Sequence, residues 1–395
     1  MSTPINVRKP AVMEQVRRDV ACYTSPLVES MRAANNVIEL DNMRLYLAEA
    51  FGFCDGVKRA IEIAYATCRM FPNRRLWLIG EIIHNPEVNG RLDAMGLHHL
   101  PWDFHDPAYD KLSADDVVIM PAFGVPTDLR RRLDASGVAL VDSTCGNVIK
   151  VWTRVKTYAK AGVTSVIHGK SKHEETLATA SQSHGNGFLG HYIIINGQKE
   201  AEYLADYICG RGNRAELMAR FSGCSSPDFD PDLHLRRIGI ANQTTMLKDE
   251  TSQIQEILRA AIIERDGNDD AFLAFDTICN ATQSRQNALF NLLEKPIDAM
   301  FIIGGYNSSN TTHLAQISHK KVRTYFVESA DCLISTDSIR CWDFEQKKEI
   351  VKSLPQGASD LNRMISIGIT AGASCPDNVI EQVLLRLAEL RSCRL

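Results

Sequence analysis

One pattern occurs three times along this chain and constrains its fold more than any other feature. An apolar run of strand length ends at a cysteine, and a helical pattern starts directly after it, at Cys54, Cys145 and Cys279. After Cys145, for instance, apolar residues recur at positions i, i+3, i+4 and i+7 between Val148 and Val155, which is the spacing of one helix face. The repetition predicts three related units, each with a strand, a cysteine and a helix in that order.

Each unit then continues with two further apolar strands that run into polar or small-residue loops. The segments are RLWLIGEIIHN and DVVIMPAFGV in the first unit, TSVIHGKSKHEET and RRIGIANQTTM in the second, and DAMFIIGGYNSSN and MISIGITAGAS in the third. Strands that alternate with helices predict mostly parallel sheets, and ligands bind at the carboxyl ends of such strands. The predicted fold class is therefore α/β, with three pseudo-repeated units whose loops line one central cavity if the units pack around a pseudo-threefold axis.

The repeats also predict the domain boundaries. Residues 1–42 are polar and of mixed charge, and we expect them to form an N-terminal extension packed on the surface. The three α/β units are then expected to span residues 43–137, 138–270 and 271–395, each with one of the repeated cysteines.

Composition argues against several classes of function. The net charge is only −4 and the basic residues are spread along the chain, so we expect no binding to nucleic acid. No run of about eighteen apolar residues is present, so no membrane insertion is expected. The sequence starts without an apolar signal segment and contains no CxxC pair, which predicts a reducing compartment and argues against zinc-ribbon and thioredoxin-type sites.

The three repeated cysteines are candidate ligands of a metal cluster. A thiol at the turn that opens a helix has a lowered pKa, which favours the thiolate that binds metal. Thiolates select zinc, copper(I) or iron–sulfur clusters, and three ligands in place of four leave one iron of a cluster open to substrate. The competing interpretation is that all three are buried structural cysteines. Burial as a small apolar residue is the expectation for the other eight, Cys22, Cys68, Cys209, Cys224, Cys332, Cys341, Cys375 and Cys393.

Polar residues in the loops suit a bound phosphate or diphosphate. His84 and His173 occupy corresponding positions in the first two units. The third unit has amides and hydroxyls there, namely Asn307, Ser308, Ser309 and Asn310. Ser374 and the pair Thr244 and Thr245 add hydroxyl donors. Such residues are also ordinary loop composition, so this pattern alone leaves a structural role open.

Two acidic residues, Glu174 and Glu175, directly follow His173. A carboxyl group beside a cluster is a source of the proton that a departing hydroxide needs. A carboxylate at the start of a helix is equally explained as a cap. We predict the chemical role for Glu175 and leave both explanations open for Glu174.

Eight ordered motifs are familiar together: AFGFCDGVKRAIE, EIIHN, DSTC, HGKSKHEET, ANQTTML, DTICNATQSRQ, NSSNTTHL and TAGASCPD. In this order they resemble 4-hydroxy-3-methylbut-2-enyl diphosphate reductases, the IspH/LytB family, and the resemblance runs from about Met43 to the C-terminus. It implies a three-unit α/β cloverleaf around a central 4Fe-4S cluster, with Cys54, Cys145 and Cys279 as the three cysteine ligands.

The resemblance also implies roles for single residues. The family's diphosphate-binding residues match His84, His173, Ser308, Ser309, Asn310 and Ser374. Its catalytic glutamate matches Glu175, and the threonine that positions the substrate hydroxyl and relays a proton matches Thr244. We expect Asn307, which begins the same motif as Ser308, to join the substrate-binding set.

The implied reaction is the reductive dehydroxylation of 4-hydroxy-3-methylbut-2-enyl diphosphate to isopentenyl diphosphate and dimethylallyl diphosphate. This reaction is the last step of the methylerythritol phosphate route to isoprenoids. The implied electron donor is ferredoxin or flavodoxin. The implied location is the cytoplasm of a bacterium, or the plastid stroma in a phototrophic eukaryote.

Two positions depart from the family pattern. Phe123 stands in PAFGV where many bacterial members have a histidine, and the sequence resembles the plant and cyanobacterial branch there. Lys170 is a candidate to offset the missing cation. Gly146 follows Cys145 where proline is usual, which is expected to loosen that turn.

Two other functions compete with a reductase. A non-redox hydro-lyase of the aconitase type also uses a cluster with an open iron, and it would turn over without a reductant. An iron–sulfur sensor, or a zinc-bound structural protein, would bind phosphate in its loops only for regulation. Metal and sulfide analysis separates zinc from a cluster, and a requirement for reductant separates the two enzymes.

Overall fold

The computed structural model describes residues 3–185, 188–275, 278–355, 360 and 362–393. The chain divides into two compact units, each assembled from separate segments of sequence. Unit 1 consists of Met1–Asn6, Asn73–Gly80 and Leu97–Cys279, and unit 2 consists of Val7–Pro72, Glu81–Gly96 and Asn280–Leu395. Among the described residues, no helix has both the length and the apolarity needed to cross a membrane.

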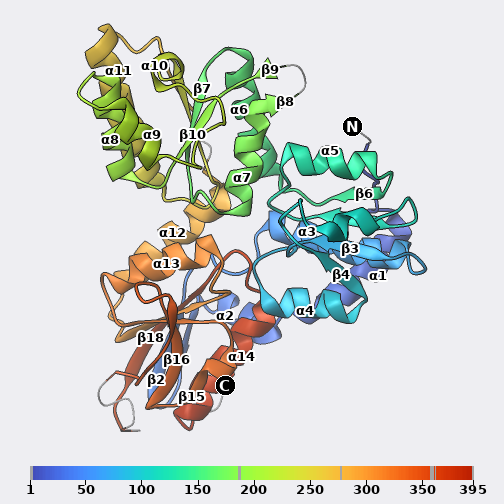
Figure 1. The fold of residues 1–395 in the computed structure, drawn as a ribbon. Helices are drawn as coiled ribbons and strands as arrows, with labels where there is room; N and C mark the ends of the chain where they lie inside the picture. Colours follow the sequence, from blue (N-terminus) through green and yellow to red (C-terminus); the bar gives the residue numbers. More distant parts are fainter. Residues whose placement is uncertain (1–2, 186–187, 276–277, 356–359, 361, 394–395) are drawn as a thin grey trace. The chain divides into compact units, whose positions relative to one another are not determined.

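Unit 1 contains two four-stranded sheets in which all strands are parallel (Figure 1). Across the first sheet the strands are β4 (Leu97–Leu100), β3 (Leu76–Ile79), β5 (Val117–Met120) and β6 (Ala139–Asp142). Across the second they are β10 (Tyr192–Ile195), β7 (Thr164–His168), β11 (Ile238–Asn242) and β12 (Phe272–Ala274). Strands β5, β7 and β11 are buried at every position, as expected of parallel strands covered on both faces.

The main sheet of unit 2 has five strands. Across it they are β14 (Thr324–Val327), β13 (Ala299–Ile303), β18 (Ile365–Ala371), β2 (Met43–Leu47) and β1 (Val37–Glu39). Four of them are parallel, and β1 adds to the edge by antiparallel pairing with β2. The observed mixture of helices with mostly parallel sheets confirms the predicted α/β class.

The three sheets share one topology. In each, the first strand after a cysteine is an inner strand: β3 after Cys54, β7 after Cys145 and β13 after Cys279. The next strand of the same sheet (β4, β10 or β14) lies on one side of it, and the third (β5, β11 or β18) lies on the other. The fourth place is taken by the strand that leads to a further cysteine: β6 leads to Cys145, β12 to Cys279 and β2 to Cys54. These strands therefore pair with strands that the sequence placed in a neighbouring repeat. The division at residues 138 and 271, and the cloverleaf arrangement, stay predictions.

Helices connect the strands in both units. Those of unit 1 are η2 (Pro107–Lys111), α5 (Thr127–Ala135), α6 (Gly146–Lys160), α7 (Glu174–Ala180), η3 (Ser181–Ser183), α8 (Gln198–Ile208), α9 (Arg214–Arg220), α10 (Pro231–His234) and α11 (Lys248–Asp266). Those of unit 2 are α1 (Pro10–Val20), η1 (Ala21–Tyr23), α2 (Pro26–Ala33), α3 (Asp55–Met70), α4 (Pro86–Ala94), α12 (Asn280–Leu293), α13 (Ser309–His319), η4 (Ala330–Cys332) and α14 (Asp377–Leu390).

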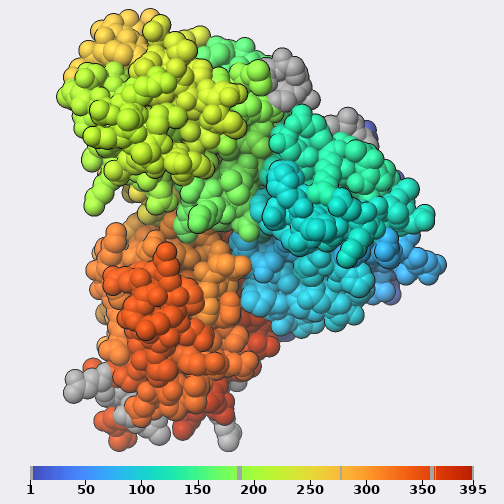
Figure 2. Space-filling view, in the orientation of Figure 1, coloured from blue at the N-terminus to red at the C-terminus, as the bar shows by residue number. Residues whose placement is uncertain are grey.

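Two small antiparallel sheets complete the described strands. One is the pair β8 (His184–Gly185) and β9 (Phe188–Leu189) of unit 1, and the other consists of β15 (Leu333–Ser335), β16 (Ser338–Asp343) and β17 (Lys348–Lys352) of unit 2. Strand β17 is largely exposed, and its sheet contributes to the surface of unit 2 in Figure 2.

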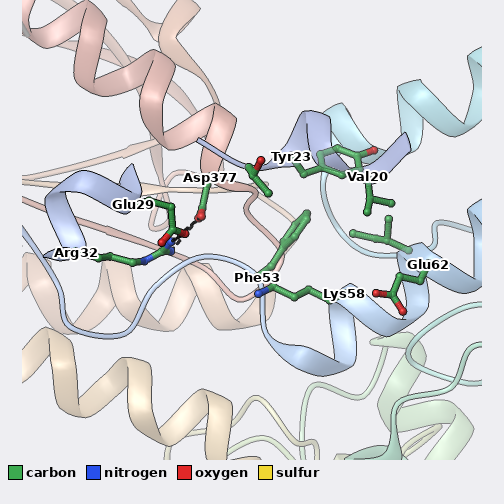
Figure 3. A pocket seen from close by; sticks show the side chains of 10 residues that line it. Val20, Tyr23, Glu29, Arg32, Phe53, Lys58, Glu62 and Asp377 are labelled. Carbon is green, nitrogen blue, oxygen red and sulfur yellow. Dashed lines mark hydrogen bonds and ion pairs between the residues drawn. The ribbon is translucent and has the colours of Figure 1, made fainter. Parts of the chain in front are cut away.

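From Val7 onward, the N-terminal extension is an integral part of unit 2. Val28 and Met31 of α2 are fully buried in the apolar core that also contains strands of the main sheet. Arg32 forms an ion pair with Asp377 at the start of α14, with 2.8 Å between Nη1 and Oδ2. Figure 3 shows this pair at the edge of a cavity of about 280 Å³ that is also lined by Phe53, the residue before Cys54. The extension therefore lines a cavity together with Phe53, which precedes a predicted cluster ligand in the sequence.

Candidate functional site

Each of the three repeated cysteines directly precedes a helix, as predicted. Cys54 and Cys145 are the N-cap residues of α3 and α6, and Cys279 is followed at once by α12. Both N-cap residues have extended backbone, with ψ of 165° and 138°. All three side chains are partly exposed thiols outside any disulfide.

The backbone of each cysteine is anchored in the same way. The amide of Cys145 donates to the carbonyl of Ala122 (2.9 Å), and that of Cys54 donates to Ala373 (3.2 Å). The amide of Cys279 donates to the carbonyl of Thr244 (3.3 Å). The three acceptors lie in the loops that follow β5, β18 and β11, which are the third strands of their sheets. The repeat therefore extends from the order of elements to the hydrogen bonds that hold each cysteine.

The sulfur atoms of Cys54 and Cys279 accept hydrogen bonds. The amide of Val57 donates to Sγ of Cys54 at 3.4 Å, and Nδ2 of Asn147 donates to Sγ of Cys279 at 3.0 Å. N–H···S bonds and a helix N-terminus both stabilise a thiolate. Because partly exposed, thiolate-stabilised sulfurs are what an iron–sulfur cluster requires, the donor set fits such a group.

The remaining cysteines contrast with these three. Cys68, Cys332, Cys341, Cys375 and Cys393 are buried, as expected of structural cysteines, whereas Cys22, Cys209 and Cys224 are partly buried. Burial raises the pKa of the Cys68 thiol to about 12 and also raises that of Cys375. The thiols of Cys68 and Cys375 therefore stay protonated at neutral pH.

In unit 1 the structure brings together His173, Glu175 and Thr244. Glu175 lies in the first turn of α7 and is only 3% exposed. Its Oε1 accepts a hydrogen bond of 2.6 Å from the backbone amide of Thr244 in the loop after β11. Its own amide donates to Nδ1 of His173 at 3.2 Å, so that ring nitrogen acts as an acceptor and the proton of the neutral imidazole resides on Nε2. Glu174, at the start of α7, is partly exposed and lies 3.9 Å from His173 Nδ1.

Gln243, for which the sequence predicted no role, holds this group in place. It is fully buried, and its Oε1 accepts from the amide of Lys170 and from the hydroxyl of Thr176, both at 3.1 Å. Its Nε2 donates to Oγ1 of Thr245 at 2.8 Å. One side chain therefore joins the turn before His173, the helix of Glu175 and the loop of Thr244. The one sequence signal for Gln243 is its position directly before a predicted site threonine.

Phe123, which stands where many bacterial members have a histidine, and Lys170, the candidate to offset the missing cation, also lie in unit 1. The ring of Phe123 contacts the imidazole of His173 edge to face, with 6.2 Å between ring centroids. Burial lowers the pKa of the Lys170 ammonium. A phenyl ring thus packs against His173, and Lys170 is a partly buried cation three residues before it.

In unit 2 the structure brings together His84, Ser308, Asn310 and Ser374. Ser308 is the N-cap of α13, and its Oγ lies 3.5 Å from Oγ of Ser374. The Ser374 hydroxyl donates to the carbonyl of His84 at 3.1 Å. Asn310 Oδ1 accepts from the amide of Ala373 at 3.0 Å, which ties α13 to the loop after β18.

Two neighbouring residues at the start of α13, Ser309 and Asn310, each have a buried polar atom without a partner among the described residues. Ser309 and Asn310 are 3% and 4% exposed, and among the described residues no hydrogen-bond partner reaches Ser309 Oγ or Asn310 Nδ2. A buried polar group without a partner costs roughly 1–3 kcal/mol. Such atoms beside the N-terminus of a helix are what an anion-binding site needs.

Glu81 is a second residue that the sequence did not single out. Its Oε2 lies 2.9 Å from Nδ1 of His84 and 3.0 Å from Nδ2 of Asn307. A carboxylate can only accept, so the proton of the His84 ring on this side is on Nδ1. Glu81 thus orients both predicted substrate-binding side chains.

The prediction that the groups of units 1 and 2 face one cavity stays a prediction.

Comparison with known proteins places these features in a family. The family model described as LytB protein matches residues 45–388. A curated 4-hydroxy-3-methylbut-2-enyl diphosphate reductase of Thermosynechococcus vestitus is 44% identical over 375 residues, which cover 94% of this chain and 90% of the relative. One from Synechococcus sp. (strain RCC307) is 44% identical over 373 residues, with 93% and 89% covered.

Solved structures agree with this assignment. A structure titled as (E)-4-hydroxy-3-methyl-but-2-enyl diphosphate reductase, the terminal enzyme of the non-mevalonate pathway, matches 88% of this chain and 99% of its own, with a TM-score of 0.52 and 26% identity. A reductase structure from Plasmodium falciparum matches 87% of each chain with a TM-score of 0.63, and at 21% identity it supports the fold alone. Because the family model and relatives at 44% identity both extend over most of the sequence, the chain belongs to the LytB protein family.

Proposed function

We propose that this chain removes the hydroxyl group of 4-hydroxy-3-methylbut-2-enyl diphosphate reductively and forms isopentenyl diphosphate and dimethylallyl diphosphate. The relatives that carry this reductase name align with more than nine-tenths of the chain. This reaction is the last step of the methylerythritol phosphate route. Family membership alone does not assign residues, so their roles are proposed from the local geometry.

The observation that carries the assignment is the position of Thr244. Its amide donates to the Glu175 carboxylate at 2.6 Å, and its carbonyl accepts from the amide of Cys279 at 3.3 Å. One residue thus connects a buried carboxyl group to a candidate cluster ligand. A proton source fixed beside a redox centre is what the removal of a hydroxyl group as water requires.

The cofactor of the proposal is a 4Fe-4S cluster with Cys54, Cys145 and Cys279 as ligands. The helix-opening positions of the three cysteines and the N–H···S bonds to Cys54 and Cys279 support it. When bound, such a cluster supplies electrons and Lewis acidity. Three ligands leave a position for substrate.

Binding of the diphosphate is assigned to seven residues: His84, His173, Asn307, Ser308, Ser309, Asn310 and Ser374. The buried, unpartnered Ser309 Oγ and Asn310 Nδ2 support this role, because phosphate oxygens would complete their hydrogen bonds. Nε2 of His173 is a donor in the tautomer that the Glu175 amide selects. The neutral donors position the diphosphate, and the histidines add charge complementarity when protonated.

Proton transfer is assigned to Glu175, with Thr244 as its relay. Replacing a hydroxyl group by hydrogen, with loss of water, takes two electrons and two protons. In its acid form Glu175 gives one proton to the departing oxygen, and the Thr244 amide stabilises the carboxylate that remains. The Thr244 hydroxyl positions the substrate oxygen for this transfer. We propose ferredoxin or flavodoxin as the one-electron donor, and bacterial cytoplasm or plastid stroma as the compartment.

An anaerobic assay with and without reductant tests the proposal. Protein reconstituted with iron and sulfide should convert the substrate to the two isoprenoid diphosphates only when a strong one-electron reductant is present. Turnover without reductant would instead indicate the hydro-lyase. Absence of any product with a fully loaded cluster would leave the sensor function and overturn the reductase.

A further inference from the structure

Helix α6, which starts directly after Cys145, is the most one-sidedly charged helix of the three that follow the repeated cysteines. Its sequence GNVIKVWTRVKTYAK contains four basic residues and no acidic one. Its exposed residues recur every three or four positions and so form one face, here called the α6 face: Gly146, Ile149, Lys150, Thr153, Arg154, Thr157 and Lys160. The face begins at the turn of a proposed cluster ligand.

Two cations of the α6 face, Lys150 and Arg154, contact neutral groups in the part of the chain that the structure describes. Lys150 Nζ donates to Oδ1 of Asn147 at 3.5 Å, and the guanidinium of Arg154 lies over the ring of Phe275 at 4.1 Å. Burial and the like charge of Lys160 lower the pKa of Lys156. Within the described ranges, no carboxylate pairs with Lys150, Arg154 or Lys156. Arg237 extends the charge, because it donates to the carbonyl of Ala161 at the end of the helix.

The equivalent helices differ. The basic residues of α3 share their helix with Asp55 and Glu62, and Glu62 pairs with Arg8 at 3.1 Å. Helix α12 has a single basic residue, Arg285, which is buried and donates to the carbonyl of Gly52. Among these three helices, α6 is therefore the one that combines several basic residues with no acidic residue.

The α6 face also contains exposed apolar area. Ile149 is 44% exposed and lies one turn from Cys145, since its amide donates to the Cys145 carbonyl at 3.1 Å. Phe275 is 38% exposed under Arg154. Charged residues around a few exposed apolar side chains are the usual composition of a transient protein interface.

We infer that the α6 face docks an acidic one-electron carrier protein. This inference rests on the proposed function, because the carrier's role is to deliver electrons to a cluster held by Cys145. The carrier gives one electron per encounter and leaves oxidised, so one turnover consumes two reduced carriers. Complementary charge speeds such encounters and makes them sensitive to salt.

The test is a double charge reversal on the reconstituted holoenzyme, Lys150→Glu with Arg154→Glu. Reduced acidic [2Fe–2S] ferredoxin is the first electron source, and dithionite with methyl viologen is the second. We expect kcat/KM for the ferredoxin to fall about tenfold or more at low salt, and the rate with the small reductant to stay at the wild-type value. The matched control is Lys320→Glu with Lys348→Glu, two exposed lysines of unit 2 that change the net charge equally.

An unchanged kcat/KM and salt dependence with ferredoxin would overturn the inference, and so would an equal loss in the control. Failure of the proposed function looks different, because the wild-type protein would then form no product with either electron source. Titration of the wild-type holoprotein with oxidised ferredoxin still decides the docking in that case. Binding that the double variant loses supports the α6 face, and binding that it keeps excludes it.

Discussion

The polar groups of unit 1 and unit 2 differ in how completely their hydrogen bonds are satisfied. In unit 1 the Glu175 carboxylate accepts a hydrogen bond from the Thr244 amide. Both polar atoms of the Gln243 side chain, Oε1 and Nε2, also have hydrogen-bond partners. In unit 2 Ser309 Oγ and Asn310 Nδ2 are buried without one, as far as the described residues show. A satisfied network is rigid and preorganised, whereas unpartnered donors are stabilised by a ligand. The comparison supports the proposed roles of Glu175 and Thr244 of unit 1 in proton transfer, and of Ser309 and Asn310 of unit 2 in contacts to the diphosphate.

The largest expected effect is that of Glu175→Gln on turnover. The amide has no proton to give to the departing oxygen, so kcat should fall about 10²- to 10⁴-fold. Its carbonyl oxygen still accepts from the Thr244 amide, so substrate affinity should change little. Anaerobic kcat and an independent Kd measurement check this split. Equal losses in both would break the assignment of chemistry to unit 1.

Ser309→Ala should have the opposite profile. A charged hydrogen bond contributes about 1.5–3 kcal/mol, so substrate affinity should fall about tenfold to a hundredfold. The unliganded protein should keep or slightly raise its Tm, because a buried hydroxyl without a partner is removed. Ser318→Ala is the matched control in the same helix, since Ser318 Oγ already bonds Thr324 Oγ1 at 2.7 Å. That control should lower Tm and spare binding; a Ser309→Ala variant that behaves like it would contradict the comparison.

Gln243→Leu tests the preorganisation of unit 1. It leaves the Lys170 amide and the Thr176 and Thr245 hydroxyls without this partner, which should lower the free energy of unfolding by about 1–3 kcal/mol. Because Gln243 positions the loops of Glu175 and Thr244, kcat should fall more than substrate affinity. Denaturant unfolding and steady-state kinetics check both. If the variant is less stable but keeps the wild-type kcat, Gln243 has a structural role only.

The smallest effect is expected from Gly146→Pro. Gly146 is the first residue of α6, where proline is favoured, and Cys145 already has the extended backbone that proline demands of its predecessor. Apart from the adjacent residues and the backbone of α6 itself, no atom lies within 4 Å of a Cβ at this position. The substitution should raise the free energy of unfolding by about 0.4–1 kcal/mol. A lower stability would show that the turn needs the freedom of glycine.

The sequence alone was sufficient to predict the cysteine turns and the parallel sheets, because both follow from local patterns. Helix periodicity after Cys145 and apolar strands such as β5 depend on neighbours within a few residues. The pairing of β6, β12 and β2 could not be predicted, since an apolar strand does not encode which sheet it joins.

The supporting residues escaped prediction for a related reason. Gln243 binds Thr176, which is 67 residues away, and Asn147 binds Cys279, which is 132 residues away. The hydrogen-bond partner of a polar side chain that is distant in sequence becomes known only when the fold brings the two residues together. Glu81 lies three residues from His84, but a carboxylate at that spacing is ordinary, so it carried no signal.

The central claim is that a cluster on the three repeated cysteines drives reduction. The most direct measurement is anaerobic turnover with iron and sulfide quantified on the same sample over a series of partial reconstitutions. The account predicts that formation of isopentenyl and dimethylallyl diphosphate rises with iron content to about four iron atoms per chain and stops without reductant. Product formed by iron-free or zinc-loaded protein, or no product at full iron content, would contradict it.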